Sequence, residues 1–104
     1  LENARGVGRH FRKGLAELGN KHALIGDVRG VGLATGVELV HDRASKAPAG
    51  DVMHRLRNLI RGEGALVGGE GRHGNVLKIR PPIVFSRADA DFAVAAIDRA
   101  LGRL

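Results

Sequence analysis

Residues 75–85, Asn-Val-Leu-Lys-Ile-Arg-Pro-Pro-Ile-Val-Phe, decide the fold, because they hold a short strand that has to stop at a double proline. Each proline lacks a backbone N–H and fixes φ, so Pro81 and Pro82 cannot continue a sheet ladder. The sequence therefore predicts a strand over Val76–Ile79 and a turn that leads the chain away from the sheet.

Two cations, Lys78 and Arg80, lie at the end of this strand. Residues two apart in a strand project from the same face, so the pair suits a carboxylate or a phosphate group. Lysine and arginine at a strand edge are also common solvated residues that discourage pairing with another chain. Both interpretations stay open on the spacing alone.

A helix is predicted directly after the prolines. Ser86 is a favoured N-cap residue, and Asp89, three positions later, completes an approximate capping box. Apolar residues then recur at helical spacing. The expected buried stripe consists of Ala90, Val94, Ile97, Leu101 and Leu104.

Two further helices and three further strands are expected upstream. Residues 1–19 and a segment that begins near Val52 show amphipathic helical spacing. Between them, the β-branched and glycine-containing stretch over residues 24–40 predicts strands near Asp27–Arg29 and Leu33–Val40. We further expect a polar loop from His41 to Gly50, a short strand at Ala65–Val67 and a glycine-rich loop from Gly68 to Gly74. The order α-β-β-α-β-β-α predicts an α+β fold, in which helices cover a small, mainly antiparallel sheet.

The chain has 104 residues and 43% hydrophobic content, which is enough for one domain with one core. It begins with Leu1, inside a predicted helix and without an initiator methionine, so we expect residues 1–104 to be a piece of a larger protein. The sequence has no cysteine for a disulfide framework and no apolar run of membrane-spanning length, and we expect no leader before the first helix. A cytoplasmic protein with no membrane contact is therefore the default expectation.

The net charge of +6 raises the question of nucleic-acid binding. The excess is spread over two segments, since residues 1–22 and 42–61 each hold five cations against two anions. Tryptophan and tyrosine are absent and only three phenylalanines are present, so a base-stacking platform is not expected. We predict no nucleic-acid partner, and a non-catalytic basic binding or interaction module stays as an alternative class.

The other candidate motifs of the sequence do not predict a cofactor, a metal site or a catalytic residue. Gly30–Gly36 is rich in glycine, but a strand follows it, whereas a dinucleotide fingerprint needs a helix N-terminus there. The five histidines show no paired metal spacing, and no nucleophile elbow or cysteine nucleophile is present. No catalytic and no metal-binding residue is predicted in this chain.

Four stretches together carry a family resemblance: residues 25–33, 36–40, 75–85 and 86–92. With Gly-Asp-Val-Arg-Gly-Val-Gly-Leu in the first stretch and Pro-Pro before a capped helix, the chain resembles the carboxy-terminal part of class III pyridoxal-phosphate-dependent aminotransferases. The resemblance covers essentially the whole chain. It implies the small domain of the aspartate-aminotransferase (fold-type I) enzymes, joined to a large domain and working as a homodimer.

In that family the Schiff-base lysine, the aspartate under the pyridine nitrogen and the phosphate-binding groups belong to the large domain. The resemblance thus implies pyridoxal phosphate bound by that missing domain, with no catalytic or cofactor-binding residue in this chain. The parent would transfer an amino group between a small amine or amino acid and an oxo acid. This domain would position the substrate, and we expect it to be inactive when isolated.

The resemblance also gives Lys78 a role, with one departure from the family. In much of the family an arginine three residues before the first proline holds the substrate carboxylate, and Lys78 occupies that position here. Arginine binds a carboxylate through two parallel N–H bonds, whereas lysine is a point charge. The segment is most similar to the branch that includes phospho-lyases of phosphorylated amino alcohols. We therefore predict Lys78 and Arg80 as substrate-binding residues and keep phosphate elimination as an alternative reaction.

Overall fold

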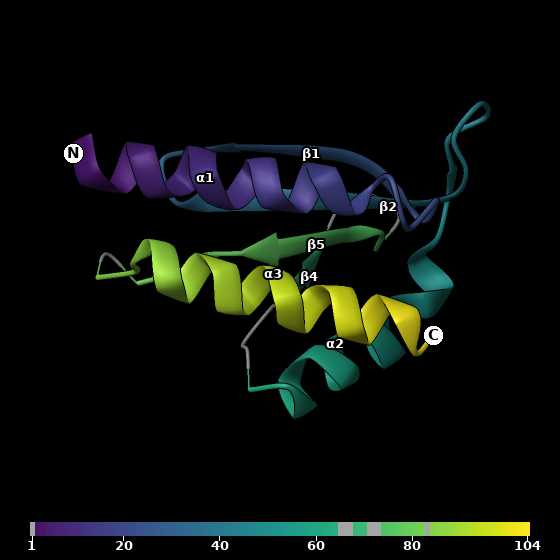
Figure 1. Ribbon diagram of the computed structural model, residues 1–104. Helices are drawn as coiled ribbons and strands as arrows, with labels where there is room; N and C mark the ends of the chain where they lie inside the picture. The colour runs from purple at the N-terminus through teal and green to yellow at the C-terminus, as the bar shows by residue number, and fades with distance from the viewer. Residues whose placement is uncertain (1, 65–67, 71–73, 83) are drawn as a thin grey trace.

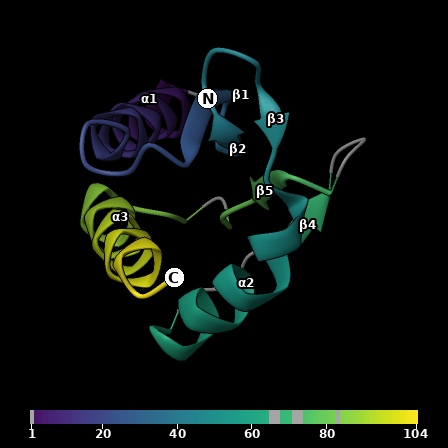
Figure 2. The same cartoon turned by 90° about the vertical axis from the view of Figure 1, so that its right-hand side faces the viewer.

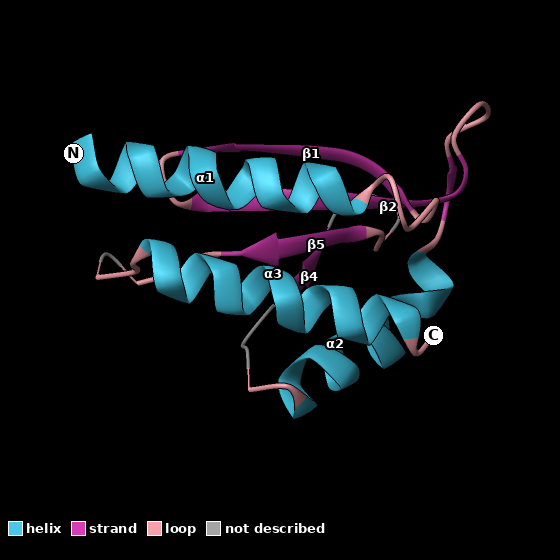
Figure 3. Ribbon diagram, in the orientation of Figure 1, coloured by secondary structure: helices cyan, strands magenta, loops and turns pink. Residues whose placement is uncertain are grey.

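The computed structural model describes residues 2–64, 68–70, 74–82 and 84–104. The described part of the chain consists of helices and short strands, as Figure 1 and Figure 3 show. In order, the elements are α1 (Glu2–Leu18), β1 (Ile25–Val31), β2 (Ala34–Asp42), β3 (Ala47–Pro48), the 3₁₀ turn η1 (Gly50–Val52), α2 (Met53–Gly62), β4 (Gly68–Glu70), β5 (Val76–Ile79) and α3 (Arg87–Gly102).

The described strands form one antiparallel sheet in the order β1-β2-β5-β4, and the short β3 pairs with β2. Its register aligns four residues in one row across the sheet: Arg29 faces Gly36, Gly36 faces Lys78, and Lys78 faces Gly68. Because side chains alternate between the two faces of a strand, residues of such a row share a face. The row thus brings distant parts of the sequence to one side of the sheet.

The helices lie mainly on the other side. Helices α1 and α3 run alongside each other and cover one face of the sheet, while α2 lies near β4 and α3 (Figure 2). Apolar side chains from the three helices and the central strands form a single core. Its largest fully buried members are Phe11, Leu15, Val37, Leu39, Leu56, Ile60, Leu77 and Ile97.

The turn after β5 is held in place where it joins α3. At the start of α3 the Ser86 hydroxyl accepts a hydrogen bond from the Asp89 amide (3.1 Å), and the Asp89 carboxylate accepts one from the Ser86 amide (3.0 Å). This confirms the predicted capping box. Phe85 packs edge-on against Phe11 of α1, with ring centroids 5.5 Å apart. The chain that leaves the sheet at Pro81 is therefore anchored to both helices of the covered face.

The predicted α+β class is confirmed, but several boundaries were wrong. The first strand extends over Ile25–Val31 instead of Asp27–Arg29, because its pairing with β2 continues through the glycines up to the turn. The expected loop His41–Gly50 contains strand β3. Gly68–Glu70, expected in a loop, forms strand β4, since backbone pairing with β5 outweighs the low strand propensity of glycine. The strand expected at Ala65–Val67 lies outside the described residues.

The predicted stripe of α3 was correct in part. Ala90, Ile97 and Leu101 are buried, whereas Val94 is half-buried. Leu104 is 38% exposed, because the helix ends at Gly102 before the stripe reaches it. Small residues at Ala96 and Ala100 share the buried face, which lets the helix approach its neighbours closely.

Candidate functional site

Both predicted site residues line one cavity. Lys78 and Arg80 come from β5 and the residue after it, and the cavity of about 370 Å³ also has walls from β1 and β2. Lys78 belongs to the row with Arg29 and Gly36, on the face away from the helices, while its neighbour Leu77 is fully buried in the core. The alternation along β5 therefore directs the cation to this cavity.

A third cation, Arg29 of β1, reaches the same cavity. Its guanidinium donates to Asp27 (2.8 Å) and to Glu38 (3.2 Å). The hydrogen bond to Asp27, with the further contribution of Glu38, raises the pKa of Arg29. Arg29 therefore remains charged, and its side chain is held along the sheet surface next to the cavity.

The cavity as a whole favours an anionic group. Among the described residues that line it are three cations and no carboxylate. Gly36 carries no side chain and leaves space beside Lys78, where an added Cβ would stand 3.3 Å from the Val76 side chain. Thr35 also lines the cavity, but its hydroxyl donates to the Leu33 carbonyl (3.3 Å) and lies 3.4 Å from the Arg12 guanidinium of α1. Opposite charge is the usual partner of a carboxylate or phosphate in proteins.

Sequence reasoning named two residues of this cavity and missed Arg29 and Thr35. Arg29 could have been found only from the pairing register of the strands, which brings Arg29 beside Gly36 and Gly36 beside Lys78. Register depends on contacts between strands that lie far apart in the sequence, so the spacing within one strand could not reveal it. The binding roles of Lys78 and Arg80 themselves stay predictions.

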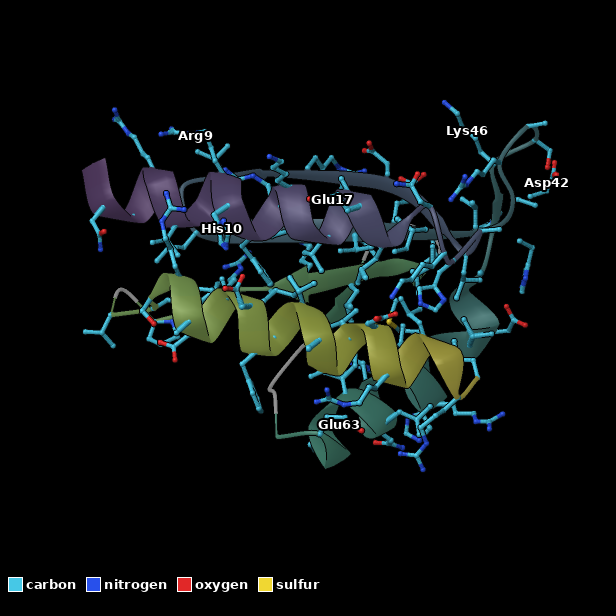
Figure 4. The ribbon with its side chains drawn as sticks, in the orientation of Figure 1. Arg9, His10, Glu17, Asp42, Lys46 and Glu63 are labelled. Atoms are coloured by element: carbon cyan, nitrogen blue, oxygen red, sulfur yellow. The ribbon has the colours of Figure 1, made fainter. Side chains whose placement is uncertain are left out.

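The ion pairs of the histidines lie elsewhere. His10 pairs with Asp91 (2.7 Å) and His22 with Asp98 (2.7 Å), so both join α1, or the turn after it, to α3. Figure 4 shows His10 on the side of α1 that faces α3. The bond from His22, together with Lys21, lowers the pKa of Asp98. These pairs hold the two helices together.

Neither a metal centre nor a membrane segment is indicated in the described residues. Within that part of the chain, no three histidine or carboxylate side chains gather as metal ligands do. No helix there has the length and apolar character that crossing a bilayer requires.

Comparison with known proteins agrees with the fold and with the resemblance. Residues 1–101 match the family described as Aminotransferase class-III. The chain is 44% identical over 103 residues to alanine–glyoxylate aminotransferase 2 homolog 2, mitochondrial, from Arabidopsis thaliana. That match covers 99% of this chain and 22% of the plant protein.

Two solved structures show the same architecture. A phospholyase from Arthrobacter in complex with phosphoethanolamine superposes with a TM-score of 0.90 at 34% identity, covering 98% of this chain and 24% of that one. A Bacillus anthracis aminotransferase gives a TM-score of 0.92 at 30% identity, covering 99% and 24%. The fold is that of a domain found in larger enzymes.

With a match over residues 1–101, the chain belongs to the class III aminotransferase family. It spans about a quarter or less of the length of the relatives it matches.

The cavity does not fit pyridoxal phosphate as a whole. The cofactor needs a lysine for its aldehyde, a carboxylate for its pyridine nitrogen and donors for its phosphate. Among the described lining residues there is neither a carboxylate nor an aromatic ring. An anionic group at one end of a small molecule fits this wall better than the complete cofactor does.

Proposed function

We propose that this chain is the C-terminal small domain of a pyridoxal-phosphate-dependent class III aminotransferase. The parent would carry a large domain that binds the cofactor and would transfer an amino group between a small amine or amino acid and an oxo acid. Two observations support this: the family match over residues 1–101 and the share of 22% of the plant aminotransferase that the chain spans. Pyridoxal phosphate supplies the electron sink for such chemistry, while protein groups orient the substrate.

The contribution of this domain is to hold the anionic end of the substrate. The observation that carries the proposal is the convergence of Arg29, Lys78 and Arg80 on one cavity. Lys78 supplies a point charge, whereas the two arginines offer planar forks that can bind two oxygen atoms at once. An anion held by all three would fix the orientation of the substrate relative to the large domain.

A second reaction, phosphate elimination from a phosphorylated amino alcohol, is supported by a specific observation. The Arthrobacter structure that shares this fold is a phospholyase in complex with phosphoethanolamine. A phosphate ester carries close to two negative charges at neutral pH, so its charge can match both Lys78 and Arg80, which a single carboxylate does not. Transamination and phosphate elimination would use the same cavity and differ in the group that leaves.

We further propose that the parent is a cytoplasmic homodimer whose partners are its own large domain and a small-molecule amine. The cysteine-free sequence agrees with a reducing compartment. Light scattering of the intact protein would measure the assembly, and a monomer that retains full activity would contradict the dimer.

The reaction is tested on the intact parent protein supplied with pyridoxal phosphate. Inorganic phosphate release from a phosphorylated amino alcohol and amino transfer to an oxo acid are measured in parallel. We expect Lys78→Ala to raise KM for the anionic substrate about tenfold, since it removes one charged contact. Lys46→Ala, an exposed lysine in the loop after β2 (Figure 4), is the matched control.

The two readouts separate the candidates. Amino transfer without phosphate release identifies an aminotransferase, and phosphate release identifies a phospho-lyase. If neither occurs, and the protein retains only binding, the non-catalytic basic module becomes the better interpretation. An unchanged KM in Lys78→Ala contradicts the assigned role of that residue.

A further inference from the structure

Helix α1 touches the turn between β1 and β2 more closely than any side chain would allow. A Cβ atom added to Gly8 would stand 1.8 Å from the carbonyl oxygen of Gly32. Gly32 lies at the tip of the turn with φ +61, a left-handed conformation that glycine adopts readily. The backbone of the helix and the backbone of the turn are therefore in direct contact.

Arg12, one helical turn after Gly8, bonds the same turn. Its guanidinium donates to the carbonyl of Gly32 at 2.8 Å, with longer contacts to the carbonyl of Ala34 and the hydroxyl of Thr35, both at 3.4 Å. The Arg12 side chain is half-buried. Charge-assisted bonds of this kind are stronger than neutral ones, so Arg12 holds the turn against α1.

The strand ends on either side of the turn that Arg12 holds form one wall of the cationic cavity. Val31, Ala34 and Thr35 line the cavity together with Arg29, which lies two residues before the end of β1. Thr35 thus lies between the Arg12 guanidinium and the cavity. A shift of the turn away from α1 would move this wall relative to Lys78 on β5.

We propose that Arg12 is a positioning residue for the anion site, acting through the β1–β2 turn together with Gly8. This inference rests on the proposed function, because it gives a supporting role in the same cavity. Arg12 does not line the cavity among the described residues. Its effect is on the distance between the wall that carries Arg29 and Thr35 and the strand that carries Lys78.

Two substitutions displace the turn by different physical means. Arg12→Met removes the donors and retains the apolar stem, whereas Gly8→Ala adds a methyl group that collides with the Gly32 carbonyl. Arg12→Lys keeps the charge and can still donate to one acceptor. Arg9→Met, an exposed arginine on the same helix, is the matched control (Figure 4).

The experiment uses the intact holoenzyme and inorganic phosphate as the probe. Competitive inhibition by phosphate is measured first, followed by kcat/KM for an amine donor without an anionic group. We expect Arg12→Met and Gly8→Ala to raise the inhibition constant for phosphate about tenfold, with kcat/KM for the neutral amine unchanged. Arg12→Lys should recover part of the loss, and Arg9→Met should behave as the wild type does.

The outcomes are distinct. Equal losses for the neutral amine and for phosphate would show a general structural role and overturn the proposal. An unchanged inhibition constant in Arg12→Met would overturn it as well. A wild-type enzyme that is active but not inhibited by phosphate would contradict the anion site, and with it the role of Arg12. An inactive wild-type protein would contradict the proposed enzymatic function instead. If Arg12→Met does not fold, Arg12→Lys and Gly8→Ala are compared with the wild type. The inference is contradicted if both of these variants have the inhibition constant of the wild type.

Discussion

The two faces of strand β2 are built from different chemistry. On the side of the helices, Val37 and Leu39 are each 1% exposed and belong to the apolar core. Gly36 and Glu38, which alternate with them along the strand, face away from the helices. Gly36 lies beside Arg29 and Lys78, and Glu38 is bonded to Arg29. Burial of apolar surface holds the first face, while charge and open space define the second. Substitutions on the helix-covered face should therefore lower the free energy of unfolding, whereas substitutions on the open face should mainly change anion binding.

The largest difference in stability between the two faces is expected for two neighbouring residues of β5. Leu77 is fully buried on the covered face, and Lys78 lies on the open face. We expect Leu77→Ala to lower the free energy of unfolding by about 2–5 kcal/mol, because it leaves a cavity in the core. Lys78→Ala should change it by less than about 1 kcal/mol. Urea unfolding measures both, and similar losses in the two variants would refute the separation.

A smaller effect is expected where charges lie between the helices. Asp98 of α3 accepts hydrogen bonds from His22 (2.7 Å) and Lys21 (2.9 Å), and the bond from His22 is the main cause of its lowered pKa. Because the folded-state pKa is lowered, the stabilisation is complete above the ordinary pKa of an aspartate. It is lost as the pH falls through the lowered value.

Asp98→Asn should therefore reduce stability near neutral pH by about 0.5–1 kcal/mol, allowing for partial exposure of the pair. The difference from the wild type should shrink in acid, which unfolding curves at neutral pH and below about pH 4 would measure. Asp91→Asn, whose carboxylate is 68% exposed, is the control and should have a weaker effect. A difference that grows as the pH falls would contradict the assignment.

The smallest effect on stability is expected for the ion pair on the open face. Glu38 is bonded to Arg29 at 3.2 Å, and the arginine is 53% exposed. Glu38→Gln should change the free energy of unfolding by less than about 0.5 kcal/mol. It removes a negative charge beside the cavity, so inhibition of the intact enzyme by inorganic phosphate should become about twofold stronger at low salt. Weaker inhibition would show that Glu38 supports the anion site by orienting Arg29.

The sequence was most informative where one local signal determines the structure. Helical spacing located α1 and α3, and Ser86 with Asp89 marked the start of α3 through a capping box that forms as expected. Pro81 and Pro82 marked the end of β5 at Ile79. In each case the physical cause lies within a few residues of the chain.

Features that depend on pairing were harder to predict. Gly68–Glu70 has the composition of a loop and becomes a strand only because β5 offers it a partner. Arg29 was passed over as a site residue because its place beside Gly36 follows from the register of β1 and β2. The contact of Arg12 with Gly32 likewise joins residues of two elements, and nothing in the spacing of α1 distinguishes Arg12 from its neighbours.

The contact between Gly8 and Gly32 has a practical meaning for building chimeric enzymes. A hairpin taken from one relative fits the helix of another only if both backbones keep this close approach, since even a methyl group at position 8 meets the Gly32 carbonyl. Helix α1 and the β1–β2 hairpin should therefore be exchanged as one cassette. Crossover points placed between residues 18 and 25, in the turn after α1, would divide a unit that has to be inherited whole.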